Sequence, residues 1–147
     1  MRKLLIGLLL IVACTSRTTV TPVTVGSGAT GPRSALDAFL AAVRAKDLQQ
    51  LGAVWGDKEG AIRDSKRISR DDLEKRELLL MCYFGHETYK VLSDAPAVGG
   101  ERVMSVSLTK GTLTRTTNFY LVGGSDRWYV RTADIEPVRD LCNNKKK

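Results

Sequence analysis

The chain has 147 residues, a formal net charge of +7 and an apolar content of 43%. This length suits one domain with one core, and the composition excludes an intrinsically disordered chain, which would carry fewer apolar residues. The basic residues form no stripe interleaved with aromatic side chains, so we expect no nucleic-acid partner.

The first sixteen residues have the pattern of an export signal. Arg2 and Lys3 precede an apolar run from Leu4 to Ala13, which is too short to span a bilayer because a spanning helix needs about 20 apolar residues. The run ends in Ile11-Val12-Ala13-Cys14, which resembles the lipobox of bacterial lipoproteins. That resemblance implies that Cys14 receives a diacylglyceryl group and becomes the first residue after cleavage. The alternative is an ordinary secretory signal with an incidental cysteine.

Both interpretations place the protein outside the cytoplasm, and they differ in how it is held. Lipid on Cys14 would anchor the chain to the membrane, stably so with two or more acyl chains. Thr15 follows the cysteine, and the absence of Asp there resembles an outer-membrane address in cells with two membranes. We therefore expect an envelope protein that is anchored through Cys14 and faces the periplasm or the exterior.

The composition along the chain divides it into four segments. Residues 1–13 are the predicted lipoprotein signal peptide, and residues 14–33 are the lipidated N-terminus with a flexible linker rich in Thr, Gly, Ser and Pro. Such a segment has no large apolar residue with which to bury a face. A single α+β domain is predicted over 34–142, followed by a basic tail at 143–147.

Two helices are predicted at the start of the domain. Ser34 with Asp37 forms an S-x-x-D capping pair, and apolar residues then recur at helical spacing up to Val43. A second cap at Asp47 starts a helix that ends near Gly56. Residues 57–67 are polar and predict a loop with at most one helical turn.

A third helix is predicted from Arg70 to about Phe84, with Ser69 and Asp72 as its capping pair. Its first half carries a cluster of acids, which we interpret as a solvated face rather than a metal or catalytic site: Asp71, Asp72, Glu74 and Glu77. Its second half, 78–84, is apolar on every side, which predicts that this end is buried in the core.

The pattern then changes from helical to alternating. Strands are predicted at 88–92, 103–110, 112–122 and 127–132, joined by short turns at Gly111 and Gly123-Gly124. Short connections between neighbouring strands predict an antiparallel sheet, and helices followed by strands indicate an α+β fold.

The order of elements resembles the nuclear-transport-factor-2-like superfamily. The segment Ala35–Trp55 resembles the helix, Lys-Asp, second helix and Trp that open this fold, and Asp126–Arg131 resembles its usual last strand. The resemblance covers about 34–142 and implies a cone in which a curved antiparallel sheet of about four strands wraps a long helix. The superfamily is functionally diverse, so the fold alone implies no activity.

Assigning Cys14 to lipid leaves Cys82 and Cys142 as a pair. In an oxidising compartment such a pair predicts a disulfide, and two separate buried thiols are the alternative. The chain has no C-x-x-C motif, so neither a redox catalyst nor a zinc site is expected.

The chemistry-bearing residues are few, and no cofactor or metal is expected. His86, the only histidine, lies beside Glu87; the pair is a weak candidate for acid–base catalysis and more often has a structural role. Five aromatic residues either line a pocket inside the cone or fill the core: Trp55, Tyr83, Tyr89, Phe119 and Trp128.

The sequence therefore predicts a lipid-anchored binding or interaction module whose partner is an envelope protein or a small apolar ligand. The first alternative is an isomerase- or cyclase-type enzyme of the same superfamily, with His86 or a buried acid as its base. The second is a purely structural protein of the envelope.

Overall fold

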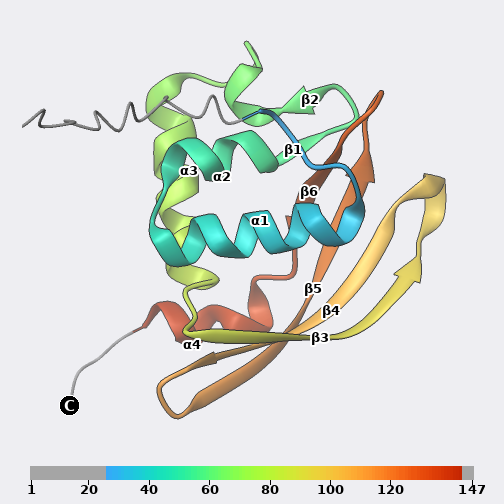
Figure 1. Ribbon diagram of the computed structural model, residues 1–147. Coiled ribbons are helices and arrows are strands. Elements are labelled where there is room, and N and C mark those ends of the chain that lie inside the picture. Colours follow the sequence, from blue (N-terminus) through green and yellow to red (C-terminus); the bar gives the residue numbers. More distant parts are fainter. Residues whose placement is uncertain (1–25, 144–147) are drawn as a thin grey trace, which may run out of the picture.

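The computed structural model describes residues 26–143, in which helices pack on one face of a curved antiparallel sheet (Figure 1). The α-helices are α1 Pro32–Ala45, α2 Leu48–Val54, α3 Arg70–Tyr83 and α4 Arg139–Cys142. Short 3₁₀ turns are η1 Ile62–Asp64, η2 Val98–Gly100 and η3 Glu136–Val138. The predicted α+β class is confirmed. The predicted signal peptide, Cys14 and the predicted linker up to residue 25 lie outside the described residues, as does the predicted basic tail after residue 143.

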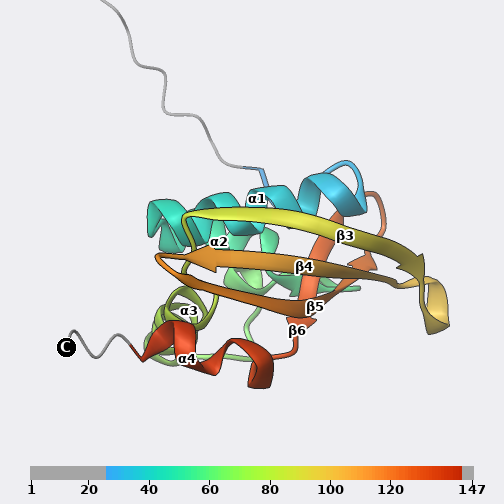
Figure 2. The same ribbon diagram turned by 90° about the horizontal axis from the view of Figure 1, so that it is seen from below.

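Four strands form the main sheet in the order β3-β4-β5-β6, and all neighbours are antiparallel. They are β3 Thr88–Pro96, β4 Arg102–Lys110, β5 Leu113–Gly123 and β6 Trp128–Ala133. Seen from below, the sheet runs along one side of α1 (Figure 2). A second, small sheet pairs β1 Gly56–Asp57 with β2 Gly60–Ala61, in the segment where the sequence predicted only a loop.

Strand β3 is longer than predicted. It continues beyond Leu92 to Pro96, past a register shift between Val91 and Ser93. Proline has no backbone N–H to donate to a neighbouring strand, so it usually marks the end of a predicted strand. Strand β3 lies at the edge of the sheet, where that N–H donor is not needed.

Helix α1 begins at Pro32 and not at Ser34. The cap is Gly31, whose backbone N–H donates to the Ser34 hydroxyl at 3.1 Å, and the same hydroxyl donates to the Gly31 carbonyl at 2.9 Å. Proline suits the first helical position because its missing N–H has no helical partner there. Asp37, the expected capping partner, instead accepts from Arg33 and from the Tyr89 hydroxyl.

Part of the segment assigned to the linker belongs to the fold. Ala29 and Trp128 exchange two backbone hydrogen bonds of 2.9 and 2.8 Å, and the Gly28 N–H donates to the Ala53 carbonyl at 2.8 Å. The chain is therefore fastened to β6 and α2 before α1 begins.

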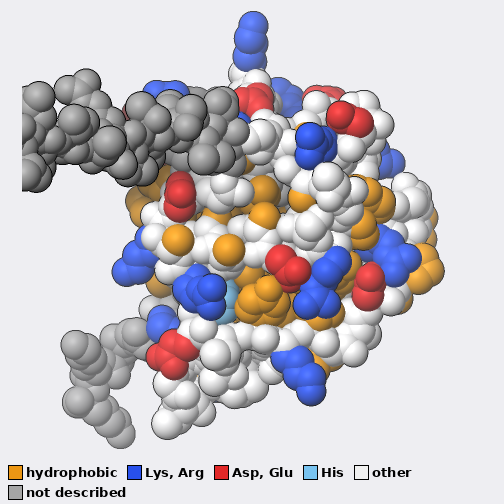
Figure 3. All heavy atoms as spheres, viewed as in Figure 1, with side chains coloured by type: hydrophobic (Ala, Val, Ile, Leu, Met, Phe, Trp, Pro, Cys, Tyr) orange, Lys and Arg blue, Asp and Glu red, His pale blue; other side chains and the backbone are white. Residues whose placement is uncertain are grey.

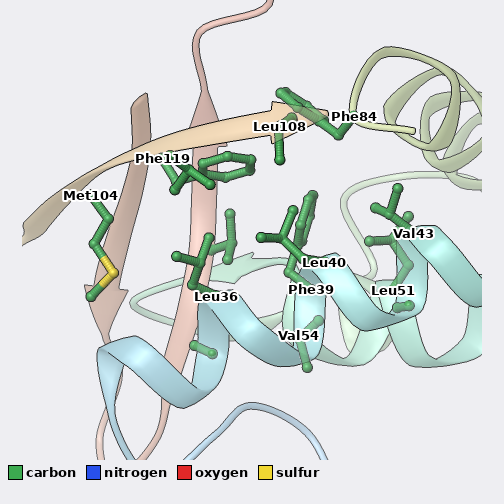
Figure 4. Packing of buried hydrophobic residues seen from close by; sticks show 14 of the residues in the cluster. Leu36, Phe39, Leu40, Val43, Leu51, Val54, Phe84, Met104, Leu108 and Phe119 are labelled. Atoms are coloured by element: carbon green, nitrogen blue, oxygen red, sulfur yellow. The ribbon is translucent and has the colours of Figure 1, made fainter. Parts of the chain in front are cut away.

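The core lies between the inner face of the sheet and the helices (Figure 4). Phe39 from α1, Phe84 from the end of α3 and Phe119 from β5 meet with ring centroids 5.1–6.1 Å apart. Aliphatic side chains complete this cluster, among them Leu36, Leu40, Leu51, Met104 and Leu108. These residues occupy the space between α1 and the sheet.

The apolar end of α3 is not buried all round, so that expectation is wrong. Leu78 and Leu79 are 52% and 54% exposed, whereas Phe84 is fully buried. The only fully buried residue within α3 is Glu77. Only one face of the helix points toward the core. Leu78 and Leu79 are exposed because no other element covers them within the described chain.

No helix among residues 26–143 is long and apolar enough to cross a membrane. On the face shown in Figure 3, lysine and arginine side chains are interspersed with acidic ones.

Candidate functional site

A cavity of about 360 Å³ lies where α2, η1 and the first half of α3 meet. Its walls combine apolar and charged side chains: Leu48, Gln49, Arg63, Ser65, Ile68, Arg70, Leu73, Glu74 and Glu77. Its volume falls within the range of small-molecule sites, about 300–1,000 Å³.

One face of α3 supplies almost half of this lining. Arg70, Leu73, Glu74 and Glu77 follow the i, i+3, i+4, i+7 spacing that puts residues on the same helix face. The helix begins where predicted, because the Ser69 hydroxyl accepts from the Asp72 N–H at 3.1 Å.

Glu77 is the distinctive residue of the cavity. The residue is only 4% exposed, and its carboxyl group forms no hydrogen bond or ion pair with residues 26–143, although its oxygens are not sealed off from the cavity. Burial, and then the nearby charge of Glu74, raise the pKa of Glu77 to about 7. The carboxyl is therefore divided between its neutral and ionised forms near neutral pH.

Gly52 makes room for this carboxyl. A Cβ atom at Gly52 would stand 2.5 Å from Glu77 Oε1 and 3.1 Å from the Arg63 Cβ. The carboxyl thus lies against the backbone of α2, which explains a glycine in the interior of a short helix, where it weakens the helix.

Arg63 is held to the wall of the cavity. Its Nη1 donates to the Gln49 carbonyl at 3.3 Å, its Nη2 to the Ser27 hydroxyl at 3.4 Å, and its Nε lies 3.6 Å from Asp64 Oδ1. None of these contacts involves Glu77.

A second cavity, of about 420 Å³, lies beside β2 and η1 and includes Tyr129. Three of the four charged side chains that line it are already paired, and Lys66 forms no ion pair within the described residues. Arg67 contacts Asp57 at 2.6 Å and Glu59 at 3.4 Å, and the Ser27 hydroxyl donates to Asp64 at 2.7 Å. The acids that line this cavity, Glu59 and Asp64, are exposed, whereas Glu77 in the first cavity is buried.

The acidic cluster of α3 differs from the prediction at one residue. Asp71, Asp72 and Glu74 are exposed, as a solvated face requires, whereas Glu77 is buried. A signal for this was present. Glu77 occupies the inward position of the series Leu73, Glu77, Leu80 and Phe84, whose steps of four, three and four residues mark a buried helix stripe.

His86 lies apart from both cavities and is buried. Its Nδ1 is 2.9 Å from the Phe84 carbonyl, which can only accept, so Nδ1 carries the proton. Nε2 is then an acceptor, and it has no partner in the described chain. Burial lowers the pKa of His86, and the charge of Arg44 lowers it further. Glu87 is exposed and forms no pair with the ring.

The five aromatic residues line neither cavity. Phe119 is fully buried in the core, and the other four pack against that core while partly exposed. Two of these use their polar atoms: Trp55 Nε1 donates to the Arg131 carbonyl at 3.2 Å, and the Tyr89 hydroxyl donates to Asp37 at 2.7 Å. Tyr83 and Trp128 complete the group.

The sulfur atoms of Cys82 and Cys142 lie at disulfide distance, and their Cα atoms are 4.7 Å apart. This pair joins the last turn of α3 to the end of α4. Within the described residues, no three His, Cys, Asp or Glu side chains are grouped so that they could hold a metal ion.

No protein-family model, curated protein or solved structure matches this chain.

Proposed function

We propose that this protein is a lipid-anchored, extracytoplasmic binding module with a small-ligand site beside Glu77. The observation that carries the binding function is the partnerless carboxyl of Glu77 at the cavity of about 360 Å³. Taking most of a carboxyl side chain out of water without a protein partner costs free energy, and such groups in proteins usually have a partner. Because the Glu77 oxygens are open to the cavity, a ligand bound there can supply that partner.

For the domain we propose a nuclear-transport-factor-2-like cone. This assignment is supported by the order of helices before strands and by the curved antiparallel sheet of four strands beside α1 (Figures 1 and 2). In this chain the aromatic and aliphatic core fills the space between α1 and the sheet. The ligand site we propose is therefore on the helical side, between α2 and α3.

The anchor is tested by cell fractionation. Cys14→Ser should move the protein from the membrane pellet to the soluble envelope fraction, because no acyl chain can then be attached. Ser16→Ala, two residues away, is the matched control and should remain in the pellet. Mass spectrometry of the wild-type N-terminus should find diacylglycerol on Cys14. Continued pelleting of Cys14→Ser would contradict the anchor.

The binding function is tested on the full chain purified from membranes in mild detergent. Native mass spectrometry should detect a small molecule on the wild type and on Glu87→Gln, and not on Glu77→Gln. Glu87 is an exposed glutamate outside the cavity, so the control repeats the same chemical change elsewhere. A ligand that is absent from the wild type, or that stays on Glu77→Gln, would contradict the site.

One observation favours an enzyme as the second candidate. A buried carboxyl whose pKa is raised to about 7 by burial has the strength of a general base at neutral pH. If Glu77 abstracts a proton from carbon, the co-purifying ligand should take up deuterium at that carbon in D₂O with the wild type and not with Glu77→Gln. Absence of deuterium exchange would contradict the enzymatic role and leave ligand binding as the function.

A further inference from the structure

We propose that the cavity beside Glu77 is a site for a small organic amine, whose ammonium group binds the Glu77 carboxylate while its carbon chain lies against Leu48 and Leu73. This inference rests on the proposed binding function and names the chemical class of the ligand.

The first step is the kind of partner that Glu77 lacks. An ionised carboxylate only accepts hydrogen bonds, so its partner must donate. Glu74, which lines the same cavity, adds a second negative charge, and its effect on Glu77 shows that its field reaches this carboxyl. An ammonium group meets both requirements because it carries three donors and a positive charge.

Two arginines also line the cavity. Arg63 directs its guanidinium to the Gln49 carbonyl, the Ser27 hydroxyl and Asp64. Arg70 stands at the exposed start of α3, seven residues before Glu77 and therefore roughly 10 Å away along the helix axis. No hydrogen bond or ion pair joins either arginine to Glu77 within the described residues, and neither arginine lowers the pKa of Glu77. A ligand's ammonium group can therefore pair with this carboxylate.

The volume of the cavity and its apolar walls restrict the ligand further. The cavity holds a molecule of a few carbon atoms, and the leucines provide an apolar surface for its chain. A bare divalent cation fits less well, because the described residues contain no group of three carboxylate, thiolate or imidazole ligands. Arg70 at the rim would repel a second ammonium, so a monoamine is favoured over a diamine.

The affinity should depend on pH. The ammonium group binds the ionised form of Glu77, whose pKa is raised to about 7 by burial and then by Glu74. The other charged groups that line the cavity are Glu74, Arg63 and Arg70. Affinity should therefore fall about tenfold for each pH unit below about 7.

The test uses three probes of equal chain length: n-butylamine, n-butanol and butyrate. Full-length protein purified in detergent is titrated with each probe by isothermal calorimetry, at about pH 8 and about pH 6. We expect saturable binding of n-butylamine alone, about tenfold weaker at the lower pH. Glu77→Gln should lose this binding, and Glu87→Gln should retain both the affinity and its pH dependence.

Four results would overturn the proposal: equal binding of n-butanol, stronger binding of butyrate, binding of Mg²⁺ or Ca²⁺ in place of the amine, or unchanged amine binding by Glu77→Gln. Loss of folding is not a confounding cause, because Glu77→Gln removes a buried charge and should melt no lower than the wild type at about pH 8. If a native ligand is lost from Glu77→Gln while n-butylamine does not bind, the binding function stands and the amine class fails. If no native ligand is found and no probe binds, both fail.

Discussion

The Glu77 carboxyl lies against the backbone at Gly52. A methyl group on Gly52 would be only 2.5 Å from Glu77 Oε1. Glycine in a helix interior costs about 1 kcal/mol relative to alanine. Helix α2 has only seven residues and carries that cost at Gly52. The glycine therefore weakens helix α2 at a position where a larger residue would displace the Glu77 carboxyl.

Gly52→Ala is expected to destabilise the fold by about 1–2 kcal/mol, although helix propensity alone would make it stabilising. The same substitution in a Glu77→Ala background should lose most of this penalty, because only the 3.1 Å contact with the Arg63 Cβ then remains. A double-mutant cycle from urea unfolding would measure the coupling, which we expect to exceed about 1 kcal/mol. Additive effects of the two substitutions would show that the carboxyl does not lie against α2.

Helix α3 shows how one element serves both the core and the site. Its end reaches Phe84, which packs against Phe39 and Phe119, while Leu78 and Leu79 stay exposed. Phe84→Ala should cost about 3–5 kcal/mol in free energy of unfolding, since it leaves a cavity in the aromatic cluster. Leu79→Ala should change stability by less than about 0.5 kcal/mol. Similar costs for the two variants would mean that the leucine face is covered.

The C-terminal elements η3 and α4 are tied to the body by several contacts. Lys110 Nζ donates to the Leu141 carbonyl at 2.7 Å, Arg115 contacts Asp140, and Cys82 meets Cys142. If the two sulfurs are bonded, the bridge closes a loop with a sequence separation of 60 residues. In the chain-entropy model that closure stabilises the fold by roughly 4 kcal/mol.

Replacing both Cys82 and Cys142 by serine should therefore lower the melting temperature of the protein by many degrees. The wild type should show the same lower value after reduction, and the serine variant should not respond to the reductant. Both are measured by thermal unfolding with and without reductant. An unchanged midpoint in the variant would contradict the disulfide.

Elements with local signals could be predicted from the sequence. The caps at Asp47 and Ser69 accept the backbone N–H groups of Gln50 and Asp72 as expected, and all four strands of the sheet were predicted, although β3 extends four residues further. The short hairpin β1–β2 could not be predicted, because its strands have two residues each and depend on the neighbouring β6.

Glu77 was not predicted as a binding residue, because composition does not show which way a side chain points. Asp71, Asp72, Glu74 and Glu77 look alike as a charge cluster, yet of the four only Glu77 is buried, with its carboxyl against Gly52 of α2. The leucines after it suggested burial on all sides, whereas burial is decided by which elements cover the helix. The helical spacing of Leu73, Glu77 and Phe84 indicates that Glu77 lies on the buried face of α3. The number of acids in the segment does not indicate this.

For the whole molecule, two buried titratable groups act on stability in opposite directions. The pKa of Glu77 is raised from 4.5 to about 7 by burial and by Glu74. Its contribution to stability is thus complete below pH 4.5 and is lost as the pH rises through 7. Burial lowers the pKa of His86 below 6.5, so the protonated ring favours the unfolded state and stability is lost as the pH falls below 6.5.

Substituting either residue should separate these effects. In Glu77→Gln only His86 remains, so the free energy of unfolding should rise with pH between about 5 and 7. In His86→Asn, whose amide can still donate to the Phe84 carbonyl, only Glu77 remains, and stability should fall over the same range. The contribution of Glu77 should be on the order of 2 kcal/mol, because water in the cavity screens part of its shift.

The measurement is urea unfolding of the wild type and the two variants at several pH values across this range. The wild type should have the flattest profile, since its two groups oppose each other, and the two variants should have slopes of opposite sign. Glu87→Gln, at an exposed position, should reproduce the wild-type profile. If stability of Glu77→Gln still falls as the pH rises, the buried carboxyl is not the titrating group, and the charge that we assign to the ligand site must lie elsewhere in the molecule.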